Sequence, residues 1–188
     1  MRKIIAALQM SVDSFIEGPN GEMDWAMAED EETWRELDET LNSVDTFILG
    51  RRMYPEYEQY WLSLLANPSK GTENENAYAR RADKIPHIIL SKTLDKVAWK
   101  TTRIVYDVRK PKNEATTWQG YAGPRGCHFN IQSNESRLDR RVHLMINPLI
   151  LGGGKALFKD VKERHAWKLI RAKPLKLGKV SLIYNTQS

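Results

Sequence analysis

The sequence is poor in cysteine and contains no long hydrophobic run. Cys127 is the only cysteine among 188 residues, which excludes an internal disulfide and a cysteine-rich metal cluster. The four histidines show no HxxxH-type spacing, so the sequence predicts no metal site. No apolar run approaches the roughly 20 residues of a membrane span. The run that follows Met1-Arg2-Lys3 ends at Gln9 without a small-residue cleavage site, and we therefore expect a cytoplasmic protein that does not bind membranes.

What is present is typical of one soluble globular domain. The chain is 41% hydrophobic and 28% charged, and no internal repeat or low-complexity tract divides it. The net charge of +5 favours an anionic partner, which could be a nucleotide, a phosphorylated substrate or a nucleic acid. No helix-turn-helix signal, zinc finger or aromatic-basic platform supports the last of these, so we do not expect nucleic-acid binding. Most lysines between positions 155 and 179 are interpreted as solvated.

The segment DTFILGRRMYPEYEQY, residues 45–60, organises the chain. The apolar run 47–49 predicts a buried strand, Gly50 ends it, and Arg51 and Arg52 open an amphipathic helical stretch. Helix N–H groups and guanidinium groups together favour an anion at this joint. The alternative interpretation is an ordinary strand-to-helix turn with solvated arginines.

Other elements are predicted from periodicity and from turn residues. Strands are expected at 3–10, 87–90, 97–99, 103–105 and 143–151, and helices at 30–42, at 73–82 and in a short stretch ending near residue 160. Residues 11–21 and 62–76 are expected to be loops. Residues 166–177 and 180–184 are expected to form a closing antiparallel hairpin, with core side chains at Trp167, Leu169 and Ile170.

Several of these segments resemble the dihydrofolate reductase-like superfamily. They are residues 1–18 (MRKIIAALQMSVDSFIEG), 23–25 (MDW), 45–60, 88–94 (IILSKTL) and 146–158 (INPLILGGGKALF). The branch to which they are most similar is the reductase half of the bifunctional riboflavin-biosynthesis deaminase-reductase, the RibD C-terminal domain, with its stand-alone relatives. The resemblance implies a single three-layer α/β domain, with a mostly parallel central sheet, helices on both faces and a C-terminal antiparallel hairpin.

The resemblance also implies NADPH as the cofactor. Cofactor contacts would come from Ala7, which lines the nicotinamide site, from Leu49, Gly50, Arg51 and Arg52, from Ser91 and Lys92, and from Gly126. A serine and a lysine beside two arginines suit a phosphomonoester better than a ribose hydroxyl, which needs an acidic acceptor. Neither strand end carries Asp or Glu, which favours NADPH over NADH.

For the substrate side, the resemblance implies Asp13, Trp25 and Gly153 as contacts. Family members often carry glycine where Ser14 stands. Trp25 is either a wall of the substrate pocket or a core aromatic that anchors its loop. Asp30 either faces the heterocycle as a catalytic carboxylate, with its pKa raised by burial, or is only the helix N-cap, and the N-cap interpretation is favoured. Gly153 lies either near the substrate or in a simple tight turn.

Residues 109–141 show little periodicity of either kind, which is anomalous inside a compact domain. The resemblance implies a helix, a strand ending in Gly-Gly and a second helix there. If residues 114–141 are back-translated and read one nucleotide later, codon degeneracy permits KQQPGKDMLVLGGATLISNLMNLGLIDE, which has that pattern. Because degeneracy permits other strings too, two compensating frame changes, near Lys112 and near Arg141, are a hypothesis.

The two reading frames differ in their consequences. In the written sequence, Gly123 and Gly126 are the only nearby substitutes for the glycine pair, and cofactor binding would be impaired. In the other frame the protein is an intact reductase that lacks Cys127. An intact mass that matches the written sequence would exclude the second possibility.

The expected function is NADPH-dependent reduction of a heterocyclic, ribosylaminopyrimidine-like small molecule. The chain lacks the HxE…PCxxC zinc motif, so any role in riboflavin synthesis would be the reduction step alone. Dihydrofolate reductase activity and a catalytically silent nucleotide-binding relative are the alternatives, and a basic RNA-binding protein is a third. The resemblance implies a homodimer, although no stretch of sequence marks an interface.

Overall fold

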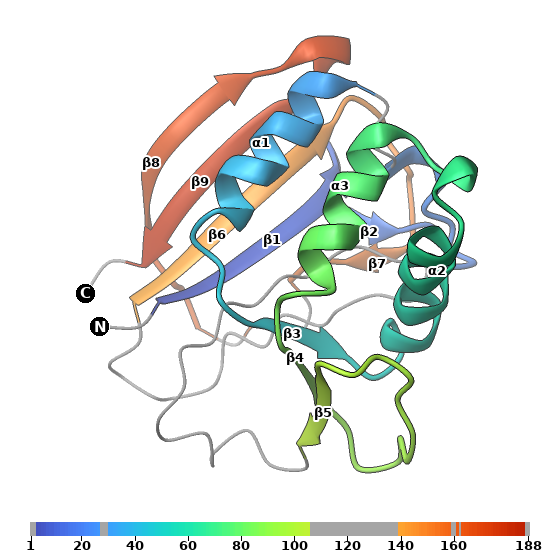
Figure 1. Cartoon of the computed structure of the whole chain (residues 1–188). Coiled ribbons are helices and arrows are strands. Elements are labelled where there is room, and N and C mark those ends of the chain that lie inside the picture. The colour runs from blue at the N-terminus through green and yellow to red at the C-terminus, as the bar shows by residue number, and fades with distance from the viewer. Residues whose placement is uncertain (1–2, 27–29, 106–138, 159–160, 162, 187–188) are drawn as a thin grey trace.

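A four-stranded sheet forms one half of the protein (Figure 1). The computed structural model describes residues 3–26, 30–105, 139–158, 161 and 163–186. The sheet has the order β1-β6-β9-β8, and its strands are β1 (Lys3–Ser11), β6 (Asp139–Asn147), β9 (Val180–Thr186) and β8 (Trp167–Pro174). β1 and β6 are parallel, whereas β9 runs antiparallel to both β6 and β8. The C-terminal hairpin therefore extends a parallel pair.

A three-stranded parallel sheet forms the other half. It has the order β3-β4-β5 and consists of β3 (Phe47–Gly50), β4 (His87–Leu90) and β5 (Thr102–Val105). β3 and β4 are buried over their first three residues, which are apolar except for His87, as expected for parallel strands covered on both faces. A separate antiparallel pair joins β2 (Phe15–Glu17) to β7 (Lys155–Ala156).

In the part of the chain that the structure describes, three α-helices cover these sheets. α1 (Glu31–Leu41) lies across the face of the four-stranded sheet, and α2 (Tyr54–Ala66) packs beside α3 (Glu73–Ala82) in the other half (Figure 1). Local sequence fixes the start of each helix: Asp30 caps α1, a proline stands in the first turn of α2, and Thr72 and Glu75 form a capping box at α3. Short 3₁₀ helices are η1 (Asp24–Ala26), η2 (Pro68–Lys70) and η3 (Lys176–Gly178).

Among the described residues, two hydrophobic clusters hold the elements together. The larger one joins the three α-helices to β3 and β4 and is dominated by aromatic side chains, which include Trp34, Tyr57, Trp61, Tyr78 and Trp99. Rings within it are in contact, since the centroids of Trp61 and Tyr78 are 4.4 Å apart. The smaller cluster joins β1 and β6 to β2, and it contains Ala6, Leu8, Met10, Ile16, Val142 and Leu157. Within the described ranges, no helix is long and apolar enough to cross a membrane.

The fold class predicted from the sequence is confirmed, but two strands differ. No strand forms at 97–99. Trp99 is buried there in an irregular segment, where its backbone N–H donates to Glu58 Oε1 at 2.8 Å. The predicted strand 143–151 ends at Asn147, because Pro148 has no N–H group to continue the ladder. The loop predicted at 11–21 contains the short strand β2.

Three further predictions are wrong. α2 continues to Ala66, into the predicted loop 62–76, because Leu64 completes the buried stripe of the helix. The segment after the three glycines forms the strand β7 instead of a helix. Leu169 and Ile170 are about half exposed on the outer strand β8, so they are not core residues. Trp167 is partly buried against the smaller cluster, and the hairpin is confirmed, with η3 in its turn.

Candidate functional site

The turns that follow β3 and β4 bring basic side chains to one place, here called the basic corner (Arg51, Arg52, Lys92 and Thr93). Gly50 and Leu90 are register partners at the carboxyl ends of the two strands, so the turns after them are neighbours. The Arg51 Nη1 group donates to Thr93 Oγ1 at 2.9 Å, which ties the two turns together. All four side chains are exposed. The corner therefore offers three cations and a hydroxyl at the end of a parallel sheet, where anionic ligands are commonly bound.

Ser91 shapes this corner from inside. It is only 6% exposed, and its Oγ accepts hydrogen bonds from the N–H groups of Thr93 and Leu94, at 3.1 and 2.8 Å. Such a serine turn fixes the direction in which Lys92 and Thr93 leave the strand. Ser91 follows β4 directly and its hydroxyl oxygen holds the turn, while the cofactor contact predicted for it stays a prediction.

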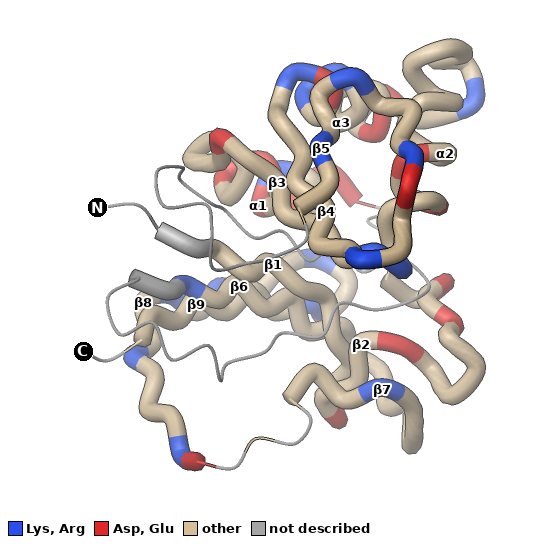
Figure 2. The backbone as a smooth tube through the Cα atoms, turned by 90° about the horizontal axis from the view of Figure 1, so that it is seen from below, with Lys and Arg blue, Asp and Glu red and all other residues tan. Residues whose placement is uncertain are grey.

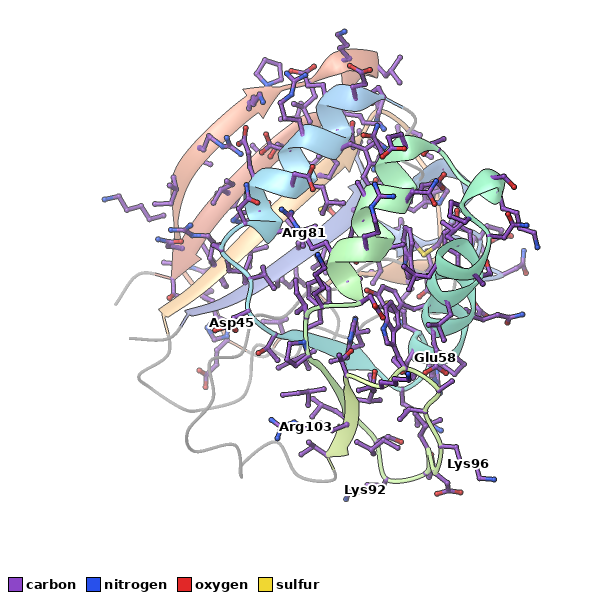
Figure 3. The ribbon with its side chains drawn as sticks, in the orientation of Figure 1. Asp45, Glu58, Arg81, Lys92, Lys96 and Arg103 are labelled. Atoms are coloured by element: carbon purple, nitrogen blue, oxygen red, sulfur yellow. The ribbon has the colours of Figure 1, made fainter. Side chains whose placement is uncertain are left out.

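Two residues of these strands and turns, Thr93 and Arg103, were not predicted as site residues from the sequence. Thr93 contributes its hydroxyl through the bond to Arg51. Arg103 is exposed on β5, opposite Ile88 of β4, and Figure 3 shows its side chain beside that strand. Figure 2, seen from below, also shows basic positions next to β4. The sequence did contain a signal for Thr93: it is a hydroxyl residue that stands two positions after Ser91, in the same turn.

The other predicted cofactor residues lie in the strands. Ala7 is half-buried in β1, opposite His143 of β6. Leu49 is 1% exposed and belongs to the aromatic cluster, so its side chain points into the core, and Gly50 ends β3 beside it. Gly126 lies outside the described residues.

Asp13 fastens two loops together, in what is here called the loop junction (Ser11, Asp13, Leu151 and Gly152). Its carboxylate accepts hydrogen bonds from Ser11 Oγ at 2.6 Å, from the Leu151 N–H at 3.1 Å and from the Gly152 N–H at 2.7 Å. The bond from Ser11, followed by those from the two backbone groups, holds the pKa of Asp13 below its ordinary value, although desolvation opposes them. Asp13 therefore joins the loop after β1 to the loop after β6.

The next residues show why glycine is needed in this loop. Gly154 has a φ of +134°, and a Cβ on it would overlap the carbonyl oxygen of Glu17. A Cβ on Gly153 would lie 3.7 Å from Pro19, an ordinary contact. Of these two glycines in the GGGK segment, Gly154 is the one that the backbone requires, and the substrate contact predicted for Gly153 stays a prediction. Ser14 has a φ of 70°, in the left-handed region that favours glycine.

β2 and β7 complete this region through a partly buried ion pair. Lys155 Nζ lies 3.3 Å from Glu17 Oε1, with side-chain exposures of 17% and 10%. Figure 2 shows the acidic and basic positions of the two strands side by side. Trp25 lies on η1, is half-buried and donates from Nε1 to the Glu22 carbonyl at 3.2 Å. It belongs to neither hydrophobic cluster.

Asp30 is the N-cap of α1, as the favoured interpretation predicted. Its Oδ1 accepts from the Thr33 N–H at 2.9 Å, and its Oδ2 accepts from Thr33 Oγ1 at 2.7 Å. Desolvation raises the pKa of Asp30, but the Thr33 hydrogen bonds and the charge of Lys179 outweigh it, and the pKa is lowered overall. A raised pKa, expected if Asp30 faced the heterocycle, is therefore wrong. Lys179 is a further partner that the sequence did not reveal.

The described contacts thus gather the predicted residues into three groups: the basic corner, the loop junction with Gly153, and Asp30 with Lys179. A parallel α/β core, a C-terminal hairpin and cations at the strand ends define a protein of the dihydrofolate reductase-like class. A structural comparison agrees with this class. A protein from Shewanella sp. PV-4, described as a candidate riboflavin biosynthesis protein, superposes with a TM-score of 0.67 at 17% identity, over 100% of both chains.

Sequence comparison identifies the family within this class. The model of the RibD C-terminal domain matches residues 2–119, and the chain therefore belongs to the RibD C-terminal domain family, whose members are generally reductases. The chain is also 30% identical to the uncharacterized protein YyaP of Bacillus subtilis (strain 168), over 98% of this chain and 95% of that protein.

Proposed function

We propose that the protein is an NADPH-dependent reductase of a small heterocyclic molecule of the ribosylaminopyrimidine type. The observation that carries the proposal is the basic corner. Three exposed cations meet there at the ends of two adjacent parallel strands, and Arg51 is already oriented by Thr93. Membership of a family of reductases supports the same reaction class.

The donor set fits a 2′-phosphate. Guanidinium groups bind phosphate in bidentate fashion, and a lysine adds a compact charge on a flexible stem. Arg51, Arg52 and Lys92 would hold the phosphate, with the Thr93 hydroxyl beside them. When bound, the cofactor supplies the hydride. The contribution of this chain is to bind and orient that cofactor and to keep water away from the reacting atoms.

The loop junction would keep water away from the reacting atoms. Asp13 joins the loops after β1 and β6, and Gly154 lets the second of them approach the backbone of Glu17. A loop fixed at both places can cover the reacting ring without the entropic cost of ordering a free segment. Ala7 would lie beneath that cover in β1, and Trp25 and Gly153 would contact the substrate.

A catalytically silent nucleotide-binding protein is the second candidate. It is favoured by one observation: Asp30, the predicted catalytic carboxylate, is occupied by Thr33 and Lys179. In either case we propose a small-molecule ligand, a cytoplasmic location and a homodimer, without nucleic acid or membrane as a partner.

Replacing one basic side chain tests the phosphate grip. We expect Lys92→Ala to weaken NADPH binding about tenfold, equivalent to ~1.4 kcal/mol, because one charge-assisted contact to the phosphate is lost. Binding of NADH should not change, since NADH has no 2′-phosphate. Titration followed by fluorescence measures both. Lys70→Ala, which removes an exposed lysine from η2, is the matched control. An equal loss for both cofactors would sink the assignment of Lys92.

A further inference from the structure

The two regions assigned to cofactor and substrate carry charges of opposite sign. The substrate side, defined here as residues 11–26 and 147–158, contains the predicted contacts Asp13, Trp25 and Gly153. Its charged residues are four carboxylates and a single lysine. The basic corner has the opposite sign, and Figure 2 shows basic positions next to β4 but an acidic position in β2. The net charge of +5 therefore does not extend to the substrate side, which is negative.

The protein itself occupies N–H groups of the GGGK loop that could otherwise bind an anion. Glycine-rich loops offer backbone N–H groups that can surround a phosphate. Here the N–H groups of Leu151 and Gly152 donate to the carboxylate of Asp13, at 3.1 and 2.7 Å. A phosphate could reach these two groups only by displacing a carboxylate that belongs to the same chain. The loop is therefore already saturated with negative charge at this place.

The lysine of the substrate side is occupied as well. Lys155 Nζ lies 3.3 Å from Glu17 Oε1, and the side chains are only 17% and 10% exposed. The two remaining carboxylates, Glu22 and Asp24, are exposed. A phosphate that approaches them meets like charges, which oppose binding. Among the described residues of these two segments, no unpaired lysine or arginine offsets that repulsion.

The neighbouring hairpin turn follows the same pattern. The turn at η3 packs against Pro148, so it borders the substrate side. Lys179 Nζ lies 3.6 Å from Asp30 Oδ2, and both side chains are largely buried. Lys176 is exposed, but its N–H donates to Glu32 Oε2 at 2.9 Å, which brings a carboxylate to the same turn. Both lysines are thus matched by carboxylates.

We propose that the substrate of this protein carries no phosphate: the substrate side admits a neutral heterocycle or its riboside and rejects the corresponding phosphate monoester. The inference rests on the proposed function and narrows its substrate class. Phosphate recognition is left to the basic corner, where it selects the cofactor. Asp13 and Glu17 determine specificity, because Asp13 fills the N–H groups of the loop and Glu17 compensates its lysine.

Inorganic phosphate tests this charge separation without cofactor or substrate. The full chain is titrated at constant pH and ionic strength and followed by ¹⁵N–¹H NMR. We expect saturable shifts of the Lys92 and Thr93 amides and none at Leu151 and Gly152. Saturable shifts at Leu151 and Gly152 would overturn the inference. Absence of shifts at Lys92 and Thr93 would instead contradict the basic corner, and with it the proposed function alone.

Turnover compares the two substrate classes directly. With NADPH, we expect kcat/KM for a 6-ribosylaminouracil to exceed that for its 5′-phosphate at least about tenfold, because only the second probe brings a phosphate to the substrate side. An equal or reversed preference would overturn the inference. Turnover of neither probe would refute the proposed function, and the phosphate titration would still decide whether the substrate side rejects anions.

Glu17→Gln tests the cause of the discrimination. It removes one negative charge and leaves Lys155 without its ion-pair partner. We expect phosphate to shift the Lys155 amide in this variant, and the preference between the two probes to fall about threefold. Glu73→Gln is the matched control, because its carboxylate is 84% exposed on α3, in the other half of the protein.

Equal changes in the Glu17→Gln and Glu73→Gln variants, or no change in Glu17→Gln, would overturn the role of Glu17. Thermal unfolding checks that each variant is folded. If Glu17→Gln does not fold, Glu22→Gln takes its place, since it removes an exposed charge from the same side and should lower the preference in the same direction.

Discussion

Single residues of this protein were predictable where their neighbours in sequence determine them. Arg51 and Lys92 each stand two residues after the last residue of an apolar run, and the structure places both in the turns that follow strand ends. Asp30 precedes an amphipathic stretch, and it is the N-cap. Against desolvation, the Thr33 hydrogen bonds that come with the N-cap lower its pKa, and Lys179 adds to them. Lys179 comes from the far end of the chain, and only the folded turn brings it within 3.6 Å, so this partner was not predictable.

Two adjacent glycines allow a backbone test at this scale. Gly154→Ala would force a Cβ into the Glu17 carbonyl at a φ of +134°. We expect a loss of about 2 kcal/mol or more in the free energy of unfolding, measured with urea. Gly153→Ala meets only Pro19 at 3.7 Å and should stay within about 0.5 kcal/mol of the wild type. Equal losses in the two variants would contradict the assigned role of Gly154.

Elements with a long apolar period were predictable, and very short ones were not. β1, β4, α1 and α3 lie within a residue or so of the expected bounds, because each buries a regular stripe or run. β2 and β7 have only three and two residues, and they form because Gly154 lets the two backbones meet. A pairing of that kind depends on tertiary contact and leaves no periodic signal in either segment.

One element-scale contact joins α1 to the C-terminal hairpin through a buried carboxylate. The side chain of Glu36 is 4% exposed and accepts hydrogen bonds from Ser181, Arg171 and Lys173. Desolvation raises the pKa of Glu36, but the bonds from Ser181 and Lys173 and the charge of Arg171 bring it below its ordinary value. A lowered pKa in the folded state means stability that is full at neutral pH and is lost as the pH falls through that pKa.

Glu36→Gln should therefore lower the free energy of unfolding by about 2 kcal/mol at pH 7, because it leaves two cations without their buried partner. The estimate is below the usual cost of breaking a buried pair, since Arg171 and Lys173 are themselves about a third exposed. Urea unfolding from pH 7 to pH 3 should show the difference from the wild type shrinking below about pH 4.

Glu39→Gln is the control for this pair of elements. Glu39 contacts the same arginine at 3.0 Å but is 48% exposed, so its loss should change stability by less than about 0.5 kcal/mol. A Glu36→Gln difference that is constant from pH 7 to pH 3 would contradict the assignment of the effect to the carboxylate charge.

At the scale of the whole molecule, the candidate site residues are distributed over two sheets. The β3-β4-β5 sheet carries the basic corner, while the β1-β6-β9-β8 sheet carries the loop junction, and its hairpin holds Lys179 against α1. The resemblance read from scattered motifs predicted this α/β class and the family, because motif order reflects the order of strands in the fold. For residues 109–141 the two reading frames still predict different proteins: an intact reductase in one frame, and impaired cofactor binding in the written sequence.

Cofactor choice is the central claim, and it is tested most directly by titrating the purified protein, after its intact mass has been measured, with NADPH and with NADH. Tryptophan fluorescence is a suitable readout, because several tryptophans lie in the cluster behind β3 and β4. We expect NADPH to bind at least about tenfold more tightly than NADH, since only NADPH carries the phosphate that the basic corner would hold. Equal affinities, or no binding by a folded protein, would contradict the account.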